Sequence, residues 1–318
     1  MFCKSLCKIM LLATGIALIS ACDSNSSTNT VSSSSGTGGS DFSLQFSAQV
    51  DGMELNCTEQ YNNLGPEGSY SIGVGDLRFY VSNLKFYDNS DVEIAVTLDS
   101  NDFQLNHDNG SVSLIDLSPA GTSDDYCGIQ SGTPRVNGII TGQVADDAIA
   151  SVSFDVGVPQ ATMKAVIAAA ASTNDAPSPL AELDWSWASG YKHFSLNFTT
   201  MDATHTELTA NSGVHFGSRD CGAGETNKAL SERDQCGLLN TPKVRLSDFD
   251  PSVNRVVVDI AQILANLNDG DFNVGGSFGL QCHSGQAQAS CDKLFNNFGV
   301  NLATGLADAT DNSVFVKQ

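Results

Sequence analysis

The chain has 318 residues and a formal net charge of −21, with 36 acidic residues against 15 lysines and arginines. Such acidity argues against nucleic-acid binding, which needs a basic surface, and against adhesion to anionic lipid headgroups. The acidic residues are spread along the chain, a distribution that favours solubility rather than a dedicated site.

The N-terminal segment has the pattern of a bacterial lipoprotein signal peptide. Two lysines precede an apolar run from Ile9 to Ile19, which leads into Ser20-Ala21-Cys22. The run is too short for an ordinary membrane-spanning helix, whereas small residues before a cysteine suit the signal peptidase. We therefore expect residues 1–21 to be removed and Cys22 to carry the lipid. Loss of the two lysines would take the formal charge from −21 to −23.

A flexible tether is predicted between the lipid and the folded domain. Residues 22–41 are rich in Ser, Thr, Asn and Gly, a composition that buries too little apolar surface to fold. Asp23 follows the lipidated cysteine, which in enteric bacteria favours retention at the inner membrane. We therefore expect a domain over residues 42–318, anchored by lipid in the bacterial cell envelope and facing the periplasm, with the inner membrane slightly favoured.

The cysteines predict disulfide bonds. Of the nine, Cys3 and Cys7 lie in the signal peptide and Cys22 carries the lipid, so six remain in the mature domain. An even number in an exported protein implies disulfides. Thiolate binding of zinc would need CxxC-type spacing, which is absent. Six cysteines allow fifteen pairings, and closeness in sequence favours Cys221–Cys236, Cys282–Cys291 and, by what remains, Cys57–Cys127.

Short runs with an apolar residue at every second position dominate the chain, the period of a half-buried strand. In chain order, the expected strands are Phe42–Val50, Leu77–Tyr87, Val92–Leu98, Val112–Leu117, Val136–Val144, Ser151–Val158, His193–Thr199, Val244–Phe249 and Arg255–Asp259. The expected helices are short: Thr162–Ala171, Ala261–Leu267 and a segment beginning at Cys291. This pattern predicts an all-β fold, an antiparallel β-sandwich with short helical insertions and about three disulfides.

Motifs of common catalytic centres are missing from the sequence. There is no GxSxG elbow, HExxH helix, phosphate-binding glycine loop or CxxCH haem attachment. The acidic stretch Asn268-Asp-Gly-Asp271 lacks the spacing of an EF-hand loop. We therefore expect that the protein is not an enzyme.

The two tryptophans of the chain, Trp185 and Trp187, lie two residues apart. In an extended segment both indoles would point to the same face. Such a pair could form a core layer, a sugar-stacking platform or a target for oxidation, and the residues alone leave these alternatives open.

Several longer motifs follow one another in a characteristic order. They are Asp76-Leu-Arg-Phe-Tyr-Val-Ser82, Gly157-Val-Pro159, Ser178-Pro-Leu180, Trp185-Ser-Trp-Ala-Ser-Gly-Tyr-Lys192, and His215-Phe-Gly-Ser218 followed by Cys221. This order resembles the MbnP-like family of bacterial copper-binding proteins, also called four-Cys metallo-mystery pair proteins. The resemblance covers nearly the whole mature domain.

The resemblance implies a periplasmic or surface β-sandwich that binds copper, as Cu(I) or Cu(II). It also implies a partner, a MauG-like di-haem enzyme of the peroxidase family that oxidises a tryptophan of this protein to kynurenine. The kynurenine amine would then help to hold the metal. Carried over to this sequence, the modified residue is Trp185 or Trp187, and His215 is the best-matched ligand. Imidazole is a suitable ligand for copper.

The chain departs from the family pattern at two places, one of which is His193, where relatives usually have a plain aromatic residue. Relatives commonly carry a histidine shortly after the Gly157-Val-Pro159 motif, where this chain continues Gln160-Ala-Thr-Met163. Three alternatives follow: weaker copper binding, a site rearranged onto His193, His205 or Met163, or no copper binding.

A hairpin would bring a second histidine to His215. If the strands around His193 and His215 pair antiparallel with a turn near His205, His193 lies opposite His215 and close enough to share one ion. A slip of one residue would put the two on opposite faces. The remaining histidines, His107 and His283, lie in polar segments, and we expect them at the surface.

A second hypothesis comes from another functional class. The protein could be a carbohydrate-binding or adhesion lipoprotein in which Trp185, Trp187 and Tyr191 stack on sugar rings. A neighbouring gene for a MauG-like protein would favour copper binding, whereas neighbouring genes for polysaccharide-degrading enzymes would favour sugar binding.

Overall fold

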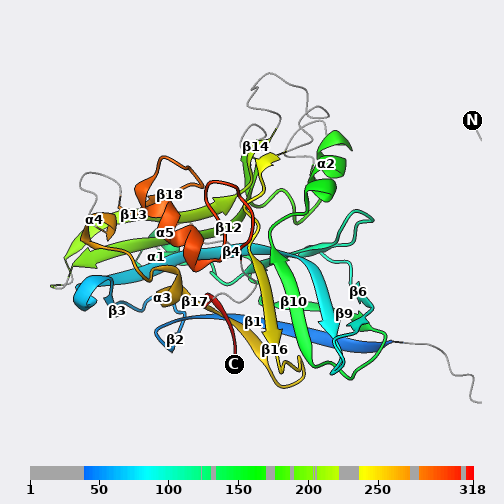
Figure 1. The fold of residues 1–318 in the computed structure, drawn as a ribbon. Helices are drawn as coiled ribbons and strands as arrows, with labels where there is room; N and C mark the ends of the chain where they lie inside the picture. The colour runs from blue at the N-terminus through cyan, green and yellow to red at the C-terminus, as the bar shows by residue number, and fades with distance from the viewer. Residues whose placement is uncertain are drawn as a thin grey trace, which may run out of the picture. The chain divides into compact units, whose positions relative to one another are not determined.

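Two β-sheets dominate the part of the chain that the structure describes (Figure 1). The computed structural model describes residues 39–122, 124–129, 134–169, 176–186, 190–202, 204, 206–221, 236–272, 279–308 and 313–318. They belong to one structural unit, Gly38–Gln318. The predicted signal peptide and Cys22 lie outside the described residues. Strand β1 begins at Ser40, two residues before the strand predicted from Phe42.

The smaller sheet has six strands, of which β1 and β9 alternate between buried and more exposed positions as the sequence predicts. They are β1 (Ser40–Val50), β2 (Met53–Glu54), β6 (Val96–Leu98), β9 (Ile139–Val144), β17 (Arg255–Asp259) and β19 (Phe315–Lys317). Their order is β19-β17-β1-β9-β6, with β2 paired to β1. The ladder between β1 and β17 is parallel.

The larger sheet has eleven strands and is built around β4. They are β3 (Tyr61–Leu64), β4 (Tyr70–Tyr87), β5 (Glu93–Ile94), β7 (Gln104–Leu105), β8 (Val112–Asp116), β10 (Ser151–Val156), β11 (Asp184–Ser186), β12 (Gly190–Asp202), β13 (Glu207–Gly217), β16 (Lys243–Ser247) and β18 (Gln281–Cys282). The main path is β16-β10-β4-β12-β13-β18. A separate two-stranded sheet pairs β14 (Arg219–Cys221) with β15 (Cys236–Leu238).

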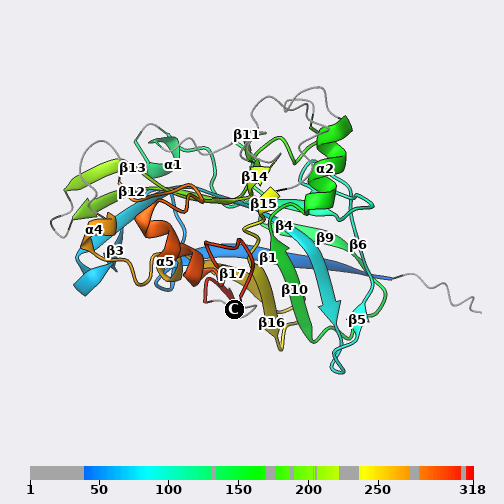
Figure 2. The same cartoon turned by 45° about the horizontal axis from the view of Figure 1, so that its top comes forward.

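Aromatic side chains connect the smaller sheet to the larger one. Figure 2 shows the ribbon of both sheets from a second direction. Phe46 of β1 lies edge-on to Phe79 of β4, with ring centroids 5.9 Å apart. Phe42 and Phe86 make a second edge contact at 5.0 Å. Edge-to-face packing of this kind adds to the free energy gained by burying the rings. The predicted β-sandwich is confirmed, with the addition that the β1–β17 and β13–β18 ladders are parallel.

The helices are short. Within the described ranges they are the 3-10 turn η1 (Pro66–Gly68) and α1 (Tyr126–Ile129), α2 (Gln160–Ala169), α3 (Ile260–Ile263), α4 (Asp269–Phe272) and α5 (Ala289–Asn297). The three predicted helices correspond to α2, α3 and α5. Helix α5 packs on β13, where Phe295 stacks on Phe216 at a centroid distance of 4.1 Å. Among the described residues, none of the helices combines the length and apolar character needed to cross a membrane.

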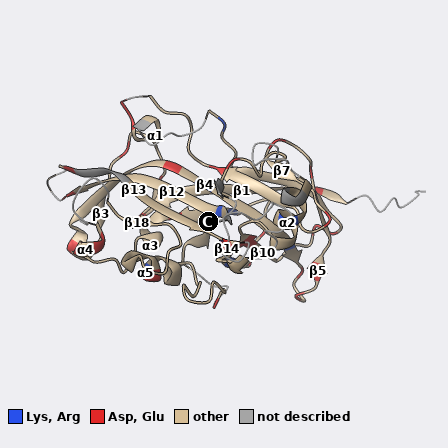
Figure 3. Cartoon of the chain, turned by 90° about the horizontal axis from the view of Figure 1, so that it is seen from above, with Lys and Arg blue, Asp and Glu red and all other residues tan. Residues whose placement is uncertain are grey.

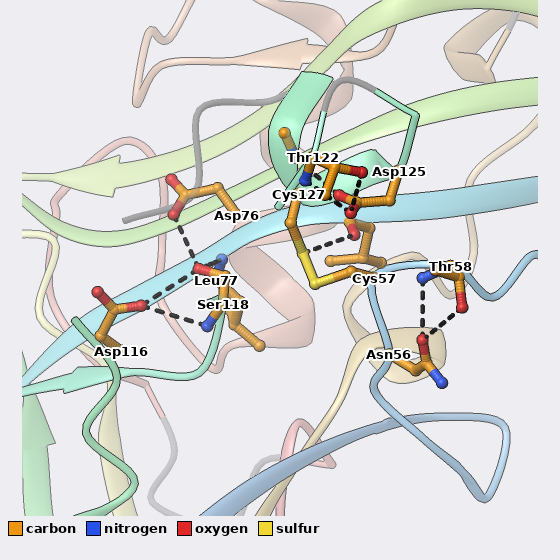
Figure 4. The surroundings of a disulfide bond; sticks show 12 residues. Asn56, Cys57, Thr58, Asp76, Leu77, Asp116, Ser118, Thr122, Asp125 and Cys127 are labelled. Carbon is orange, nitrogen blue, oxygen red and sulfur yellow. Dashed lines mark hydrogen bonds between the residues drawn. A yellow bond between two sulfur atoms is a disulfide. The ribbon is translucent and has the colours of Figure 1, made fainter. Parts of the chain in front are cut away.

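All three expected disulfides are present: Cys57–Cys127, Cys221–Cys236 and Cys282–Cys291. Cys57–Cys127 fastens the segment before β3 to α1, beside β4 (Figure 4). Cys221–Cys236 joins β14 to β15. Cys282–Cys291 joins β18 to α5.

The charge distribution agrees with the sequence. Asp and Glu residues lie on many separate elements rather than on one face (Figure 3). The acidic excess therefore marks no single binding surface among the described residues.

The disulfides differ in the length of chain that they close, which predicts a difference in stabilisation. Cys57–Cys127 spans 70 residues and Cys282–Cys291 spans 9. Loop-closure entropy predicts that replacing both cysteines of the longer loop with serine lowers the free energy of unfolding by roughly 2 kcal/mol more than the same change in the shorter loop. Urea unfolding of the two double variants measures this difference. Equal losses, or a larger loss for the shorter loop, would contradict it.

Candidate metal centre

A short parallel ladder brings two histidines together. Strand β18 pairs with β13 through Gly213↔Gln281 and Val214↔Cys282. The next residue on each strand is a histidine, so His215 and His283 lie side by side. Their ring centroids are 4.7 Å apart.

Hydrogen bonds hold this segment in register. The Ser284 hydroxyl accepts a bond from the Gly217 amide at 2.8 Å and donates to the His215 carbonyl at 3.0 Å. The Gln288 side-chain oxygen accepts from the His283 amide at 2.8 Å. The backbone around both histidines is therefore fixed from β13, β18 and the start of α5.

The two imidazoles face each other through the same ring atom. His215 Nδ1 and His283 Nδ1 are 2.9 Å apart. On the far side of each ring, His215 Nε2 lies 2.8 Å from Asn197 Oδ1, and His283 Nε2 lies 2.7 Å from Gln281 Oε1. An amide oxygen only accepts hydrogen bonds, so each Nε2 carries the proton. In the neutral rings both Nδ1 atoms then present lone pairs to one another.

Both imidazoles are biased toward the neutral form. Burial lowers the pKa of His215 to about 3, and Lys192, His283 and Arg78 act in the same direction. The pKa of His283 is also lowered, first by burial and then by Lys192 and Arg219. Neutral imidazole is the form that binds metal ions. Metal–imidazole bonds are about 2.0 Å long, so one ion lying to the side of the line between the two Nδ1 atoms can reach both, and their 2.9 Å spacing is compatible with a metal site.

His193 occupies a different place from the one expected. His215 lies opposite Ser195, not His193, because β13 carries one extra residue at each of two register shifts nearer the turn, between Met201 and Thr200 of β12 and between Thr200 and Phe198. The predicted His193–His215 pairing is therefore wrong by two residues. His193 lies in a separate bulge of β12, between the pairs Lys192↔Gly217 and Phe194↔Phe216, and its side chain is buried.

The surroundings of His193 are those of a core residue. Its Nδ1 lies 3.1 Å from the Asn240 carbonyl, and its Nε2 has no hydrogen-bond partner among the described residues. A Cβ atom at Gly157 would lie 2.7 Å from the His193 ring, which accounts for the glycine in the Gly157-Val-Pro159 motif. Burial lowers the pKa of His193 to about 4.

The other predicted site residues are less informative. His205 and Trp187 lie outside the described residues, and Trp185 is described only as part of the backbone of β11. Met163 is buried in a hydrophobic cluster with Tyr191.

The surface prediction for the two remaining histidines holds only in part. His107 is partly buried, and its Nδ1 accepts a hydrogen bond from the Asn109 amide at 3.1 Å. His283 is also partly buried and contacts His215, so its placement at the surface, away from any site, was wrong.

A second group of possible ligands has a structural explanation. Cys57, Asp125 and Cys127 place ligand atoms within 4.8 Å of one another. The two sulfurs are joined in a disulfide and cannot act as thiolates. The Asp125 carboxylate accepts from the Thr122 and Gly128 amides and so closes the turn around α1 (Figure 4).

Sequence reasoning missed His283 and the two amides, Asn197 and Gln281. The sequence signal for His283 is its place directly after Cys282, whose expected disulfide fixes that cysteine in the core. His215 similarly follows a buried valine in β13. Alternation along β12 also puts Asn197 on the same face as Ser195, which lies opposite His215.

Buried His193 predicts a pH dependence of stability in the metal-free protein. Its pKa is lowered in the folded state, so the unfolded chain takes up the proton first as pH falls through 6.5 towards 4. The stabilisation is therefore complete above pH 6.5 and is lost below it. Between pH 7 and pH 5 this group alone should lower the free energy of unfolding by roughly 2 kcal/mol.

His193→Asn retains a donor for the Asn240 carbonyl and lacks the titrating ring. Urea unfolding at both pH values should show a loss smaller by about that amount in the variant. An equal loss in wild type and variant would contradict the assignment.

Comparison with known proteins gives the fold a family. A solved structure, MbnP from Methylosinus trichosporium, matches with a TM-score of 0.68 and 22% sequence identity, over 87% of this chain and 98% of that chain. No curated protein sequence matches the chain significantly. The sequence model of the MbnP family matches residues 39–306, which is most of the chain. The protein therefore belongs to the MbnP family.

Proposed function

We propose that the protein binds copper through His215 and His283. It would be a binding protein rather than an enzyme, anchored by a lipid on Cys22 and facing the periplasm. Membership of the MbnP family supports this proposal.

One observation carries the copper proposal: the 2.9 Å approach of the two Nδ1 atoms. A proton between the two Nδ1 atoms could also hold the imidazoles at this distance, but with both Nε2 atoms already protonated toward the amide oxygens it would make one ring cationic. Burial and the neighbouring cations Lys192 and Arg78 oppose that charge at His215. A soft or borderline metal ion that prefers nitrogen ligands can be bound by two neutral imidazoles in this arrangement, and copper is such an ion.

The second part of the proposal concerns a tryptophan. A MauG-like di-haem partner would oxidise Trp185 or Trp187 to kynurenine, whose aromatic amine could add a third nitrogen ligand. The net change adds two oxygen atoms across the indole C2–C3 bond and then releases C2 as formate by hydrolysis. The oxidant must come with the partner. The backbone of β11, which carries Trp185, pairs with the start of β12.

The carbohydrate-binding alternative loses one of its three residues. The Tyr191 side chain is 1% exposed. A ring that stacks on a sugar must present one face to solvent, so Tyr191 cannot contribute to a stacking platform in this fold.

Removal of either histidine tests the copper site. For protein purified from its native envelope, His283→Ala and His215→Ala should each lower copper affinity by on the order of 100-fold or more. Loss of a ligand should exceed the 10–100-fold effect of losing a supporting hydrogen bond. Competition titration with a copper chelator measures the change.

His107→Ala is the matched control, because within the described part of the chain the hydrogen bonds of His107 are local to its own turn. It should bind copper like the wild type. Unchanged affinity in His283→Ala would show that the pair does not hold the metal.

The tryptophan modification has a separate test. Peptide-level mass spectrometry of protein from cells that express the di-haem partner should show one carbon replaced by one oxygen on Trp185 or Trp187. Deletion of the partner gene should leave both tryptophans unmodified. Two intact tryptophans in the presence of the partner would refute this part of the proposal.

A further inference from the structure

A buried carboxylate lies behind the histidine pair. Asp76 on β4 is 1% exposed. Arg78 donates to both of its oxygens, at 2.7 Å to Oδ1 and 3.0 Å to Oδ2. Ser118 donates to Oδ1 at 3.1 Å (Figure 4). Paired with a cation and surrounded by donors, Asp76 can remain buried as a carboxylate, which only accepts hydrogen bonds.

Asp76 fixes the orientation of an amide on the neighbouring strand. Asn197 lies opposite Asp76 in the β4–β12 ladder. Its Nδ2 donates to Asp76 Oδ2 at 3.1 Å, so its Oδ1 is the atom that faces His215. A flipped amide would place Oδ1 against the carboxylate, two acceptors in contact. The carboxylate therefore decides which end of the amide the imidazole meets.

The amide in turn decides which nitrogen of His215 carries the proton. With Asn197 Oδ1 at 2.8 Å, Nε2 is protonated and the Nδ1 lone pair points at His283. The opposite tautomer would let His215 donate from Nδ1 to His283 Nδ1. That hydrogen bond would occupy Nδ1 of His215 and Nδ1 of His283, and neither atom could then bind a metal ion.

We propose that Asp76 and Asn197 are positioning residues that hold His215 in its metal-accepting tautomer and prevent the histidine pair from closing on itself. This inference rests on the proposed copper function only in that copper binding is the reason why this tautomer would be useful. The tautomer itself is a property of the metal-free protein.

The glycine opposite Asn197 is consistent with this role. A Cβ atom at Gly213 would lie 3.1 Å from Asn197 Oδ1 and 3.4 Å from His215 Nε2. Both distances are to the atoms of the amide–imidazole hydrogen bond. A side chain at this position would crowd that bond, so glycine leaves the space that it needs.

Long-range ¹H–¹⁵N correlation spectra of metal-free protein with ¹⁵N-labelled histidine read the tautomer directly. The wild type should show His215 protonated at Nε2. Asn197→Ala removes the acceptor and should produce a population protonated at Nδ1, together with a 10–100-fold loss of copper affinity. An unchanged His215 signature in Asn197→Ala would overturn the proposal.

Ser195→Ala is the matched control. Its hydroxyl donates to the same Asp76 oxygen at 3.3 Å, and the structure records no side-chain hydrogen bond from it to either histidine. It should keep both the tautomer and the affinity.

Asp76→Asn tests the first link, because an asparagine there can donate and lets Asn197 flip. It should reproduce the Nδ1-protonated signature. The wild-type signature in a folded Asp76→Asn protein would remove Asp76 from the proposal.

The two readouts separate this inference from the proposed function. A tautomer change in Asn197→Ala, in a protein that binds no copper, would uphold the positioning role and refute the copper function. Tight copper binding by both wild type and Asn197→Ala, without a tautomer change, would uphold the function and refute the positioning role.

Discussion

The candidate site depends on two backbone pairs between β13 and β18. Gly213 and Val214 pair in parallel with Gln281 and Cys282, and the histidines that follow are thereby placed side by side. So short a ladder is weak by itself. The Cys282–Cys291 disulfide fastens it to α5, and α5 packs on β13 through Phe295 and Phe216. Histidines 68 positions apart in the sequence are therefore held together by one closed unit of strand, disulfide and helix.

Electrostatics and hydrogen bonds set the protonation state and the orientation of the two histidines that the backbone brings together. Burial and nearby cations keep His215 and His283 neutral. Amide oxygens on the outer side of each ring orient the lone pairs inward. The net charge of the protein is strongly negative. The side chains near the histidine pair are positive, however, and they disfavour protonation of the two imidazoles. Supporting hydrogen bonds of this kind commonly tune metal ligands.

Local pattern was enough to predict most of the fold. Alternation in Phe42–Val50 identified β1, and closeness in sequence identified the Cys282–Cys291 pair. The site was harder to predict because it depends on register between distant segments. Two extra residues of β13, one at each of two register shifts near the turn, displaced its pairing with β12 and placed Ser195 opposite His215. His283 has no local signal, since its environment is created by a strand that is two residues long.

X-ray absorption spectroscopy of the copper-loaded protein tests the central claim most directly, because it reports the ligands of Cu(I) and Cu(II) alike. Our account predicts the scattering signature of two imidazoles in the wild type and of one in His283→Ala. Wild-type and His283→Ala spectra with the same number of imidazoles would show that copper, if bound, is held elsewhere, and would contradict the account.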